Sequence, residues 1–102
     1  MKGTIKMVEV IAILNVRSEC AAEAEKCLLP LIEGSRMDAG NIFYHCNAVE
    51  GKAGSWIFHE QWENQEVLDS HMKQPHFVAF GDAIAPMIVG DLQVFVLGKP
   101  VA

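Results

Sequence analysis

Three of the four histidines of the chain lie close together, in the segment HEQWENQEVLDSHMKQPHF at positions 59–77. The same segment carries an acidic residue, Glu60, two positions before Trp62. Histidines and carboxylates are the side chains that most often bind metals or transfer protons. The segment is therefore a candidate metal site or acid–base site, and the choice depends on which of these side chains share a face.

Glu60 is the first candidate for acid–base chemistry. Alternation along a strand predicted over residues 55–63 places it on one face with Trp56, Phe58 and Trp62. A carboxyl group buried among aromatic rings is expected to have a raised pKa, which suits a general acid or base. The alternative is structural, with Glu60 paired to an arginine or capping a backbone group. The two tryptophans also allow two interpretations: they either belong to the hydrophobic core or form a wall on which substrate stacks.

His71 and His76 are the next candidates. His71 falls on the inward face of a predicted helix with Leu68 and Met72, so it is either a proton acceptor in an apolar pocket or a buried structural histidine. His76 follows Pro75, and we expect it to form local hydrogen bonds. Metal-binding histidines on one helix face are usually three or four residues apart, whereas these two are five apart with a proline between them. Because no second carboxylate joins them in a known ligand pattern, we predict no metal site.

Composition excludes several classes of partner. The chain has 102 residues, about half of them hydrophobic, and a net charge of −5. We therefore expect one globular domain over residues 1–102 that binds neither nucleic acid nor an anionic membrane surface. No apolar run is long enough for a transmembrane helix. The N-terminal segment MKGTIKMVEVIAILNV faintly resembles a signal peptide, but Glu9 interrupts its apolar run. We predict a strand there and a cytoplasmic protein, with three cysteines that act as reduced, mostly buried small side chains.

The elements that position these side chains follow the order β-α-β-β-α-β. The sequence predicts an amphipathic helix over residues 18–37, with Ser18 as its N-cap. Asn64 is predicted to cap a second helix that Pro75 breaks in two. Strands are predicted over residues 7–16, 42–49, 55–63 and 91–98. This order predicts an α+β ferredoxin-like fold, with an antiparallel sheet and helices on one face.

Both faces of the predicted sheet are apolar. In the first strand, Val10 and Leu14 point one way and Ile11 and Ile13 the other. Helices on one side leave the second face exposed, and soluble monomers seldom expose an apolar patch of this size. We therefore expect a homodimer in which two sheets pack face to face. The helix-covered face is where we expect a pocket, because a broken helix leaves space.

Two segments resemble motifs of antibiotic-biosynthesis-monooxygenase-type domains, which include quinol monooxygenases. They are EQWENQEVLDSHMKQPHFVAF at 60–80 and LLPLIEGSRMDAGNIFY at 28–44, where Asp38 and Ala39 replace the usual Glu-Pro pair. The first strand, VEVIAILNV, also fits the family. The resemblance implies a ferredoxin-like dimeric α/β barrel. It also implies an enzyme that oxygenates dihydroxy-aromatics or anthrones without metal or flavin.

The resemblance carries over five site positions, which are Glu60, Trp62, His71, His76 and Phe77. Haem-degrading relatives need different residues at the positions that align with Ala12, His71 and Gly81, so we expect no haem chemistry.

The function that we expect is a cofactor-independent monooxygenase, an oxidoreductase that uses O₂ to oxidise a quinol-like or polyphenolic small molecule. We expect His71 to be the base and Glu60 its orienter or an alternative base. The side chains expected to bind substrate are Trp62, Trp56, Phe58, His76, Phe77 and Tyr44. No cofactor is expected. Two alternatives are an isomerase or lyase acting on a small hydroxycarbonyl compound, and a non-catalytic stress-response module that binds a small molecule.

Overall fold

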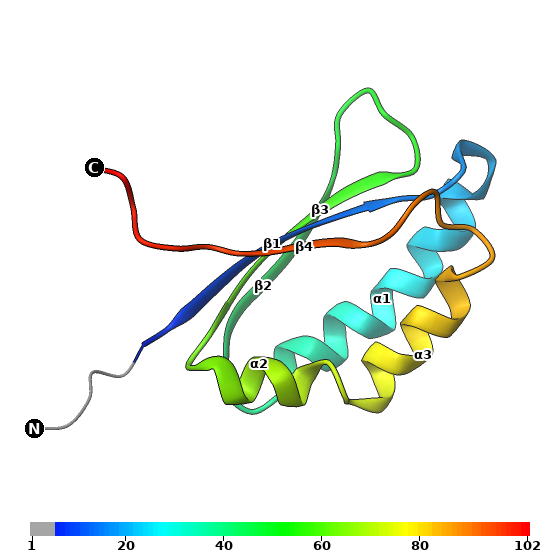
Figure 1. The fold of residues 1–102 in the computed structure, drawn as a ribbon. Coiled ribbons are helices and arrows are strands. Elements are labelled where there is room, and N and C mark those ends of the chain that lie inside the picture. Colours follow the sequence, from blue (N-terminus) through cyan, green and yellow to red (C-terminus); the bar gives the residue numbers. More distant parts are fainter. Residues whose placement is uncertain (1–5) are drawn as a thin grey trace, which may run out of the picture.

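The computed structural model describes residues 6–102. Residues 1–5, the start of the segment compared with a signal peptide, lie outside this range. A four-stranded antiparallel sheet has the order β2-β3-β1-β4, and three helices cover one of its faces (Figure 1). The bounds are β1 (Val8–Asn15), α1 (Ala21–Met37), β2 (Asn41–Ala48), β3 (Ser55–Trp62), α2 (Gln65–His71), α3 (Pro75–Ile84) and β4 (Gln93–Val96). The predicted α+β ferredoxin-like fold is therefore confirmed.

Local sequence signals explain where the second helical region begins and breaks. The Asn64 side chain accepts a hydrogen bond from the backbone N–H of Val67 at 3.0 Å, as predicted for an N-cap. Pro75 occupies the first turn of α3, where its missing N–H costs nothing. The region therefore forms two short helices, α2 and α3, with a sharp change of direction between them (Figure 1).

Two predicted boundaries were wrong. Ser18 is not the N-cap of α1, because the Cys20 N–H bonds the Arg17 carbonyl at 2.8 Å and tightens residues Ser18–Cys20 into a separate 3₁₀ turn, η1. Cys20 then precedes α1 without a side-chain cap. The last strand is also shorter than the predicted 91–98, because its ladder with β1 extends only from Val10 to Ile13.

The core lies between the sheet and the helices. Alternate residues of β1 and β3 are buried against α1 and α3, as the period-2 pattern predicts. These buried residues are Val8, Val10, Ala12 and Leu14 on β1, and Trp56, Phe58, Glu60 and Trp62 on β3. In the part of the chain that the structure describes, no helix is long and apolar enough to cross a membrane.

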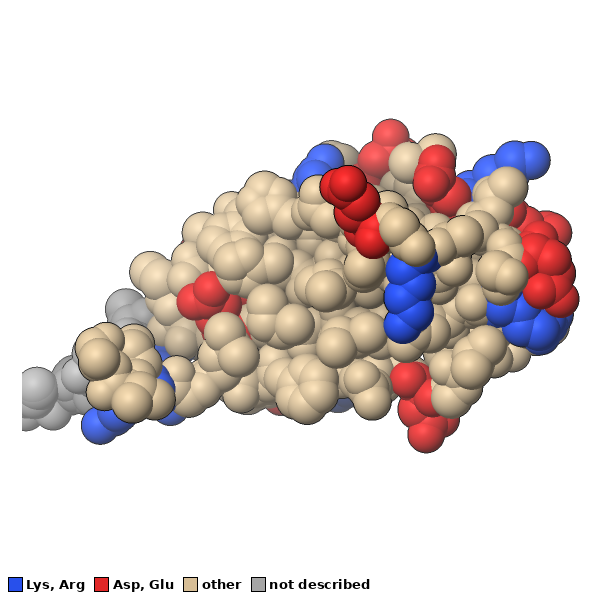
Figure 2. All heavy atoms as spheres, turned by 90° about the horizontal axis from the view of Figure 1, so that it is seen from above, with Lys and Arg blue, Asp and Glu red and all other residues tan. Residues whose placement is uncertain are grey.

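The opposite face of the sheet carries apolar side chains without a helix over it. Ile57 is 40 % exposed and Phe95 is 50 % exposed, and both lie on this face with Ile11 and Ile13. Figure 2 looks down on the molecule from this side and shows a broad area that few charged side chains interrupt. We call Ile11, Ile13, Ile57 and Phe95 the open sheet face.

Candidate active site

A small cavity lies between the sheet and the helices α2 and α3. Its volume is about 30 Å³. Ten of its twelve lining residues are apolar, and the two polar ones are Glu60 and Tyr44. Met72 and Val94 line it as well, and both are partly exposed, at 38 % and 47 %. The cavity therefore has a buried floor that carries a carboxyl group, and an outer wall formed in part by side chains that reach the surface.

Glu60 forms the polar part of that floor. It is only 6 % exposed, and its Oε1 accepts a hydrogen bond from the Trp62 indole Nε1–H at 2.9 Å. Burial raises the pKa of Glu60 from 4.5 to about 7, although the Trp62 hydrogen bond and the charge of His59 act in the opposite direction. The structural alternative required Glu60 to pair with an arginine or a backbone group. Among the described residues, Glu60 pairs with neither. A carboxyl group with a pKa near neutrality can take up and release a proton at physiological pH.

Tyr44 stands across the strand ladder from Glu60, since the two residues are paired between β2 and β3. Burial, with a smaller contribution from the negative charge of Glu60, raises the pKa of the Tyr44 hydroxyl. The Ser35 side chain acts in the opposite direction but is outweighed, so the phenol is neutral at physiological pH and keeps its hydroxyl hydrogen. Glu60 and Tyr44 together give the cavity one proton acceptor and one donor.

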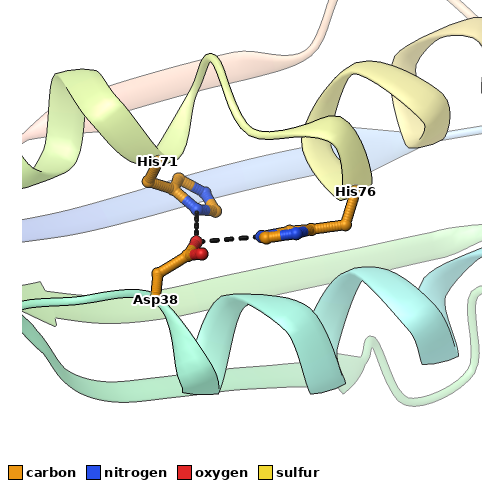
Figure 3. Close-up of side chains that lie close together, drawn as sticks. All are labelled: Asp38, His71 and His76. Atoms are coloured by element: carbon orange, nitrogen blue, oxygen red, sulfur yellow. Dashed lines mark hydrogen bonds and ion pairs between the residues drawn. The ribbon is translucent and has the colours of Figure 1, made fainter.

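His71 and His76 lie in a second polar cluster behind the cavity wall. His71 Nδ1 lies 2.8 Å from Asp38 Oδ2, and His76 Nε2 lies 2.9 Å from the same oxygen (Figure 3). The expectation that His76 bonds locally was wrong, because the turn after α1 brings Asp38 between the two helices. The His71 ring packs on Trp62 with centroids 4.5 Å apart, and it is not among the residues that line the cavity.

Gly34 on α1 makes room for this cluster. A Cβ atom at this position would lie 2.6 Å from Cγ of His76, closer than side chains approach one another. The His76 ring therefore lies against the backbone of α1. Gly40, which follows Asp38 with a φ of +84°, similarly makes room for Val67 at the start of α2. Gly34 therefore allows α1 to pack closely against α3, and Gly40 allows the turn after α1 to pack against α2.

The structure thus divides most of the predicted site residues into two groups. Glu60, Tyr44, Phe58 and Phe77 line the cavity, whereas His71 and His76 meet at Asp38. Trp62 connects the two groups through its hydrogen bond and its packing on His71. Trp56, at the other end of β3, borders a separate surface groove beside α1.

Sequence reasoning missed the role of Asp38. Its position in a turn gave no chemical signal. The only indication was that it occupies the place of the usual Glu in the motif of the resembled family. Met72 and Val94 were also missed as cavity residues, because only the packing of α2 and β4 shows which of their faces meets the cavity.

Comparisons with known proteins agree with this architecture. Residues 7–83 match the model of the antibiotic biosynthesis monooxygenase family. The uncharacterized protein sll1783 of Synechocystis is 30 % identical over 80 residues, which are 78 % of this chain and 54 % of that protein. The chain thus spans about half the length of that curated relative.

Solved structures share the fold over nearly the whole chain. A proposed antibiotic biosynthesis monooxygenase from Nitrosomonas europaea superimposes with a TM-score of 0.87, at 13 % identity, over 99 % of this chain and 97 % of its own. One from Caulobacter crescentus has a TM-score of 0.85 at 26 % identity, over 94 % and 92 % of the two chains. Since the family model covers most of the sequence, the chain belongs to the antibiotic biosynthesis monooxygenase family.

Proposed function

We propose that the protein is a cofactor-independent monooxygenase that oxidises an electron-rich hydroxyarene, such as a quinol, with O₂. The observation that carries the proposal is Glu60, a buried carboxyl group with a pKa of about 7 on the floor of an otherwise mostly apolar cavity. A hydroxyarene presents an apolar ring to such a cavity and one acidic O–H to the carboxylate. Membership of the monooxygenase family supports O₂ as the second reactant.

The reaction begins with proton transfer. The Glu60 carboxylate accepts the phenolic proton, and the phenolate then donates one electron to O₂, which gives a substrate radical and superoxide. These two combine to a carbon-bound peroxide. The O–O bond then breaks together with the C–H bond of the same ring carbon, which leaves one oxygen on the ring as a carbonyl and releases the other as water, so that a quinol and O₂ give a hydroxyquinone and water. Glu60 returns its proton to the departing oxygen, and water exclusion protects the intermediates.

Glu60 is a better candidate for the base than His71, which we expected from the sequence. Glu60 lines the cavity, whereas the Nδ1 atom of His71 is occupied by Asp38 and its ring packs on Trp62. Burial also lowers the pKa of His71, against the opposing effect of Asp38. In this proposal His71 supports Trp62, and Trp62 holds the Glu60 carboxyl group in place. The Tyr44 hydroxyl donates a hydrogen bond to a substrate oxygen.

The size of the cavity sets a condition for substrate entry. A volume of about 30 Å³ accepts a molecule of the size of O₂ or water but no aromatic ring. Ligand sites for ring compounds are on the order of 300 Å³ or larger. Met72 and Val94 are the most exposed of the wall residues, so movement of these side chains is the shortest route to a larger site. We infer that substrate enters between α2 and β4.

We also propose that two chains form a homodimer through the open sheet face. Ile11, Ile13, Ile57 and Phe95 form an apolar surface on this side, and soluble monomers seldom expose such a surface. A face of four strands can bury on the order of 1,500 Å² in total, which is typical of a stable dimer. The helices, and with them the cavity, remain on the outer side of each protomer.

Oxygen consumption with reduced naphthoquinones tests the enzymatic proposal. The wild-type protein should consume O₂ faster than the Glu60→Gln variant and the protein-free solution, and ¹⁸O₂ should place one labelled oxygen in the product. Glu63→Gln is the matched control, because Glu63 is exposed and follows the same strand. Equal rates for wild type and Glu60→Gln across a broad quinol panel would contradict the proposal. Turnover of a hydroxycarbonyl compound without O₂ would instead favour an isomerase or lyase.

A further inference from the structure

The cluster of Asp38, His71 and His76 brings together side chains from three separate elements. Asp38 follows the last turn of α1, His71 ends α2, and His76 lies in the first turn of α3. The three ligand atoms all lie within 4.8 Å of one another. Figure 3 shows both imidazole rings directed at the same carboxylate from different sides. The sequence argument against a metal site depended on the spacing of the two histidines and on the lack of a further carboxylate, and Asp38, 33 residues before His71, supplies that carboxylate.

The surroundings hold this cluster in place. The side chains of His71 and Asp38 are 2 % and 10 % exposed, and that of His76 is 21 % exposed. His71 packs on Trp62 and on Phe77, with ring centroids 4.5 and 5.1 Å apart. His76 lies against Gly34, where no other residue would leave room for its ring. The donor atoms are therefore supported by packed neighbours, as in metal sites whose ligands are preorganised.

The charge of the cluster favours a cation. Asp38 is a largely buried carboxylate, and within residues 6–102 its ion-pair partners are the two histidines. Two neutral imidazoles leave the cluster with a net charge of −1. A buried carboxylate without a permanently charged partner is costly, and a bound cation would compensate its charge.

The donor set identifies the class of ion. Two imidazole nitrogens and one carboxylate oxygen suit divalent first-row transition metals, whereas Ca²⁺ and Mg²⁺ prefer oxygen ligands. Ligand atoms around a tetrahedral zinc ion lie roughly 3.3 Å apart. The nitrogen–oxygen distances of 2.8 and 2.9 Å would therefore increase by only a few tenths of an ångström if the carboxylate withdrew. Each histidine would also move its ring proton to the other nitrogen, which requires no net proton release.

We propose that Asp38, His71 and His76 form a binding site for one divalent first-row transition-metal ion, such as Zn²⁺ or Co²⁺. Three protein ligands leave at least one coordination position for water or another ligand. The ion joins the C-terminal end of α1 to α2 and α3. The site is distinct from Glu60, so the proton transfer proposed above does not require it, and either proposal can fail without the other.

Calorimetric titration of chelator-treated protein with Zn²⁺ tests the proposal, together with the visible absorption of added Co²⁺. We expect one ion per chain and a Co²⁺ spectrum typical of nitrogen and oxygen ligands. Asp38→Asn and His76→Ala should each weaken binding by at least tenfold. The double variant His45→Ala/His59→Ala is the matched control, because it removes two histidines that are paired between β2 and β3 on the opposite face of the sheet, where His59 contacts Glu9.

Nuclear magnetic resonance of the wild-type imidazole nitrogens gives a readout that does not depend on any variant being folded. Saturating Zn²⁺ should shift the signals of His71 Nδ1 and His76 Nε2 and leave those of His45 unchanged. Unshifted signals of His71 and His76, or a loss of Zn²⁺ binding in the control double variant, would overturn the proposal. Oxygen consumption by the chelator-treated protein, measured in parallel, reports separately on the function proposed for Glu60.

Discussion

Trp62 donates its indole N–H to Glu60 over 2.9 Å, although the two residues are neighbours on one face of the same strand. The bond fixes the carboxyl group on the cavity floor and stabilises its ionised form, while burial acts more strongly in the opposite direction. The same indole ring packs against His71. The Trp62 side chain therefore connects the cavity to the cluster of Asp38, His71 and His76.

Replacement of Glu60 by Gln should stabilise the protein at neutral and alkaline pH. The folded pKa of Glu60 is about 7 against 4.5 for the free side chain, so the folded state loses stability relative to the unfolded state as pH rises between these values. A shift of this size corresponds to a penalty on the order of 3 kcal/mol, fully present above pH 7. Gln can still accept the Trp62 hydrogen bond. Urea unfolding of both proteins at pH 4 and pH 8 measures the difference.

The matched variant Glu63→Gln should show no such pH-dependent gain, because Glu63 is exposed. An equal change in both variants would mean that burial of Glu60 does not determine the effect.

Trp62→Phe should move the pH dependence of activity to higher pH. The indole N–H lowers the pKa of Glu60, so its removal raises that pKa further, and a base must be deprotonated to act. Activity that rises with a midpoint near pH 7 in the wild type should therefore rise later in the variant. Trp56→Phe removes the same group from a buried residue of the same strand that does not contact Glu60 among the described residues. Both variants should lose stability, but the pH midpoint of activity should move only in Trp62→Phe.

Gly34→Ala should destabilise the protein, by about 1–3 kcal/mol, because the new methyl group overlaps the His76 ring. Gly81→Ala provides the comparison. Gly81 also lies in a helix, but apart from the backbone of its own helix and its chain neighbours no atom lies within 4 Å of the added methyl group, so the better helix propensity should stabilise the protein by up to about 1 kcal/mol. Denaturant unfolding measures both changes. The two substitutions should have opposite signs, and a neutral Gly34→Ala would contradict the close packing of His76 on α1.

Met72→Ala should improve turnover of bulky quinols. Met72 forms part of the outer cavity wall and is already 38 % exposed, so its truncation widens the entrance at little cost in stability. We expect a lower KM for two-ring quinols than for the wild type, with kcat little changed. Val78→Ala, on the exposed surface of α3 and outside the cavity wall, should leave both constants unaltered. If KM instead rises in Met72→Ala, entry between α2 and β4 is the wrong route.

Phe95→Arg should convert the proposed dimer to a monomer. Phe95 lies on the open sheet face opposite Ile11, where a buried arginine without a partner is costly. Sedimentation equilibrium at micromolar concentration measures the mass. Leu29→Arg is the control, because Leu29 is 59 % exposed on α1 and lies away from the sheet face. A wild-type protein that sediments as a single folded chain would exclude the dimer.

The local features of this fold follow from the sequence. The alternation in SWIFHEQW places Trp56, Phe58, Glu60 and Trp62 on one face, and all four are buried in β3. The N-cap at Asn64 and the helix start at Pro75 likewise depend on neighbours only a few residues away, as the observed helix boundaries confirm. Such features are predictable because strand and helix geometry fix which nearby side chains share a face. The polar environment of Glu60 was less certain, since an arginine partner was equally compatible with the pattern.

The tertiary structure alone decided which distant residues meet. Asp38 lies 33 residues before His71 and 38 before His76, and no periodicity relates a turn after one helix to the ends of two others. Their meeting depends on the close approach of α1 to α3 at Gly34, which is a property of packing. For the same reason the sequence placed His71 on the inward face of its helix but could not show that Asp38 binds its Nδ1 atom. Packing also determined that Glu60, rather than His71, borders the cavity.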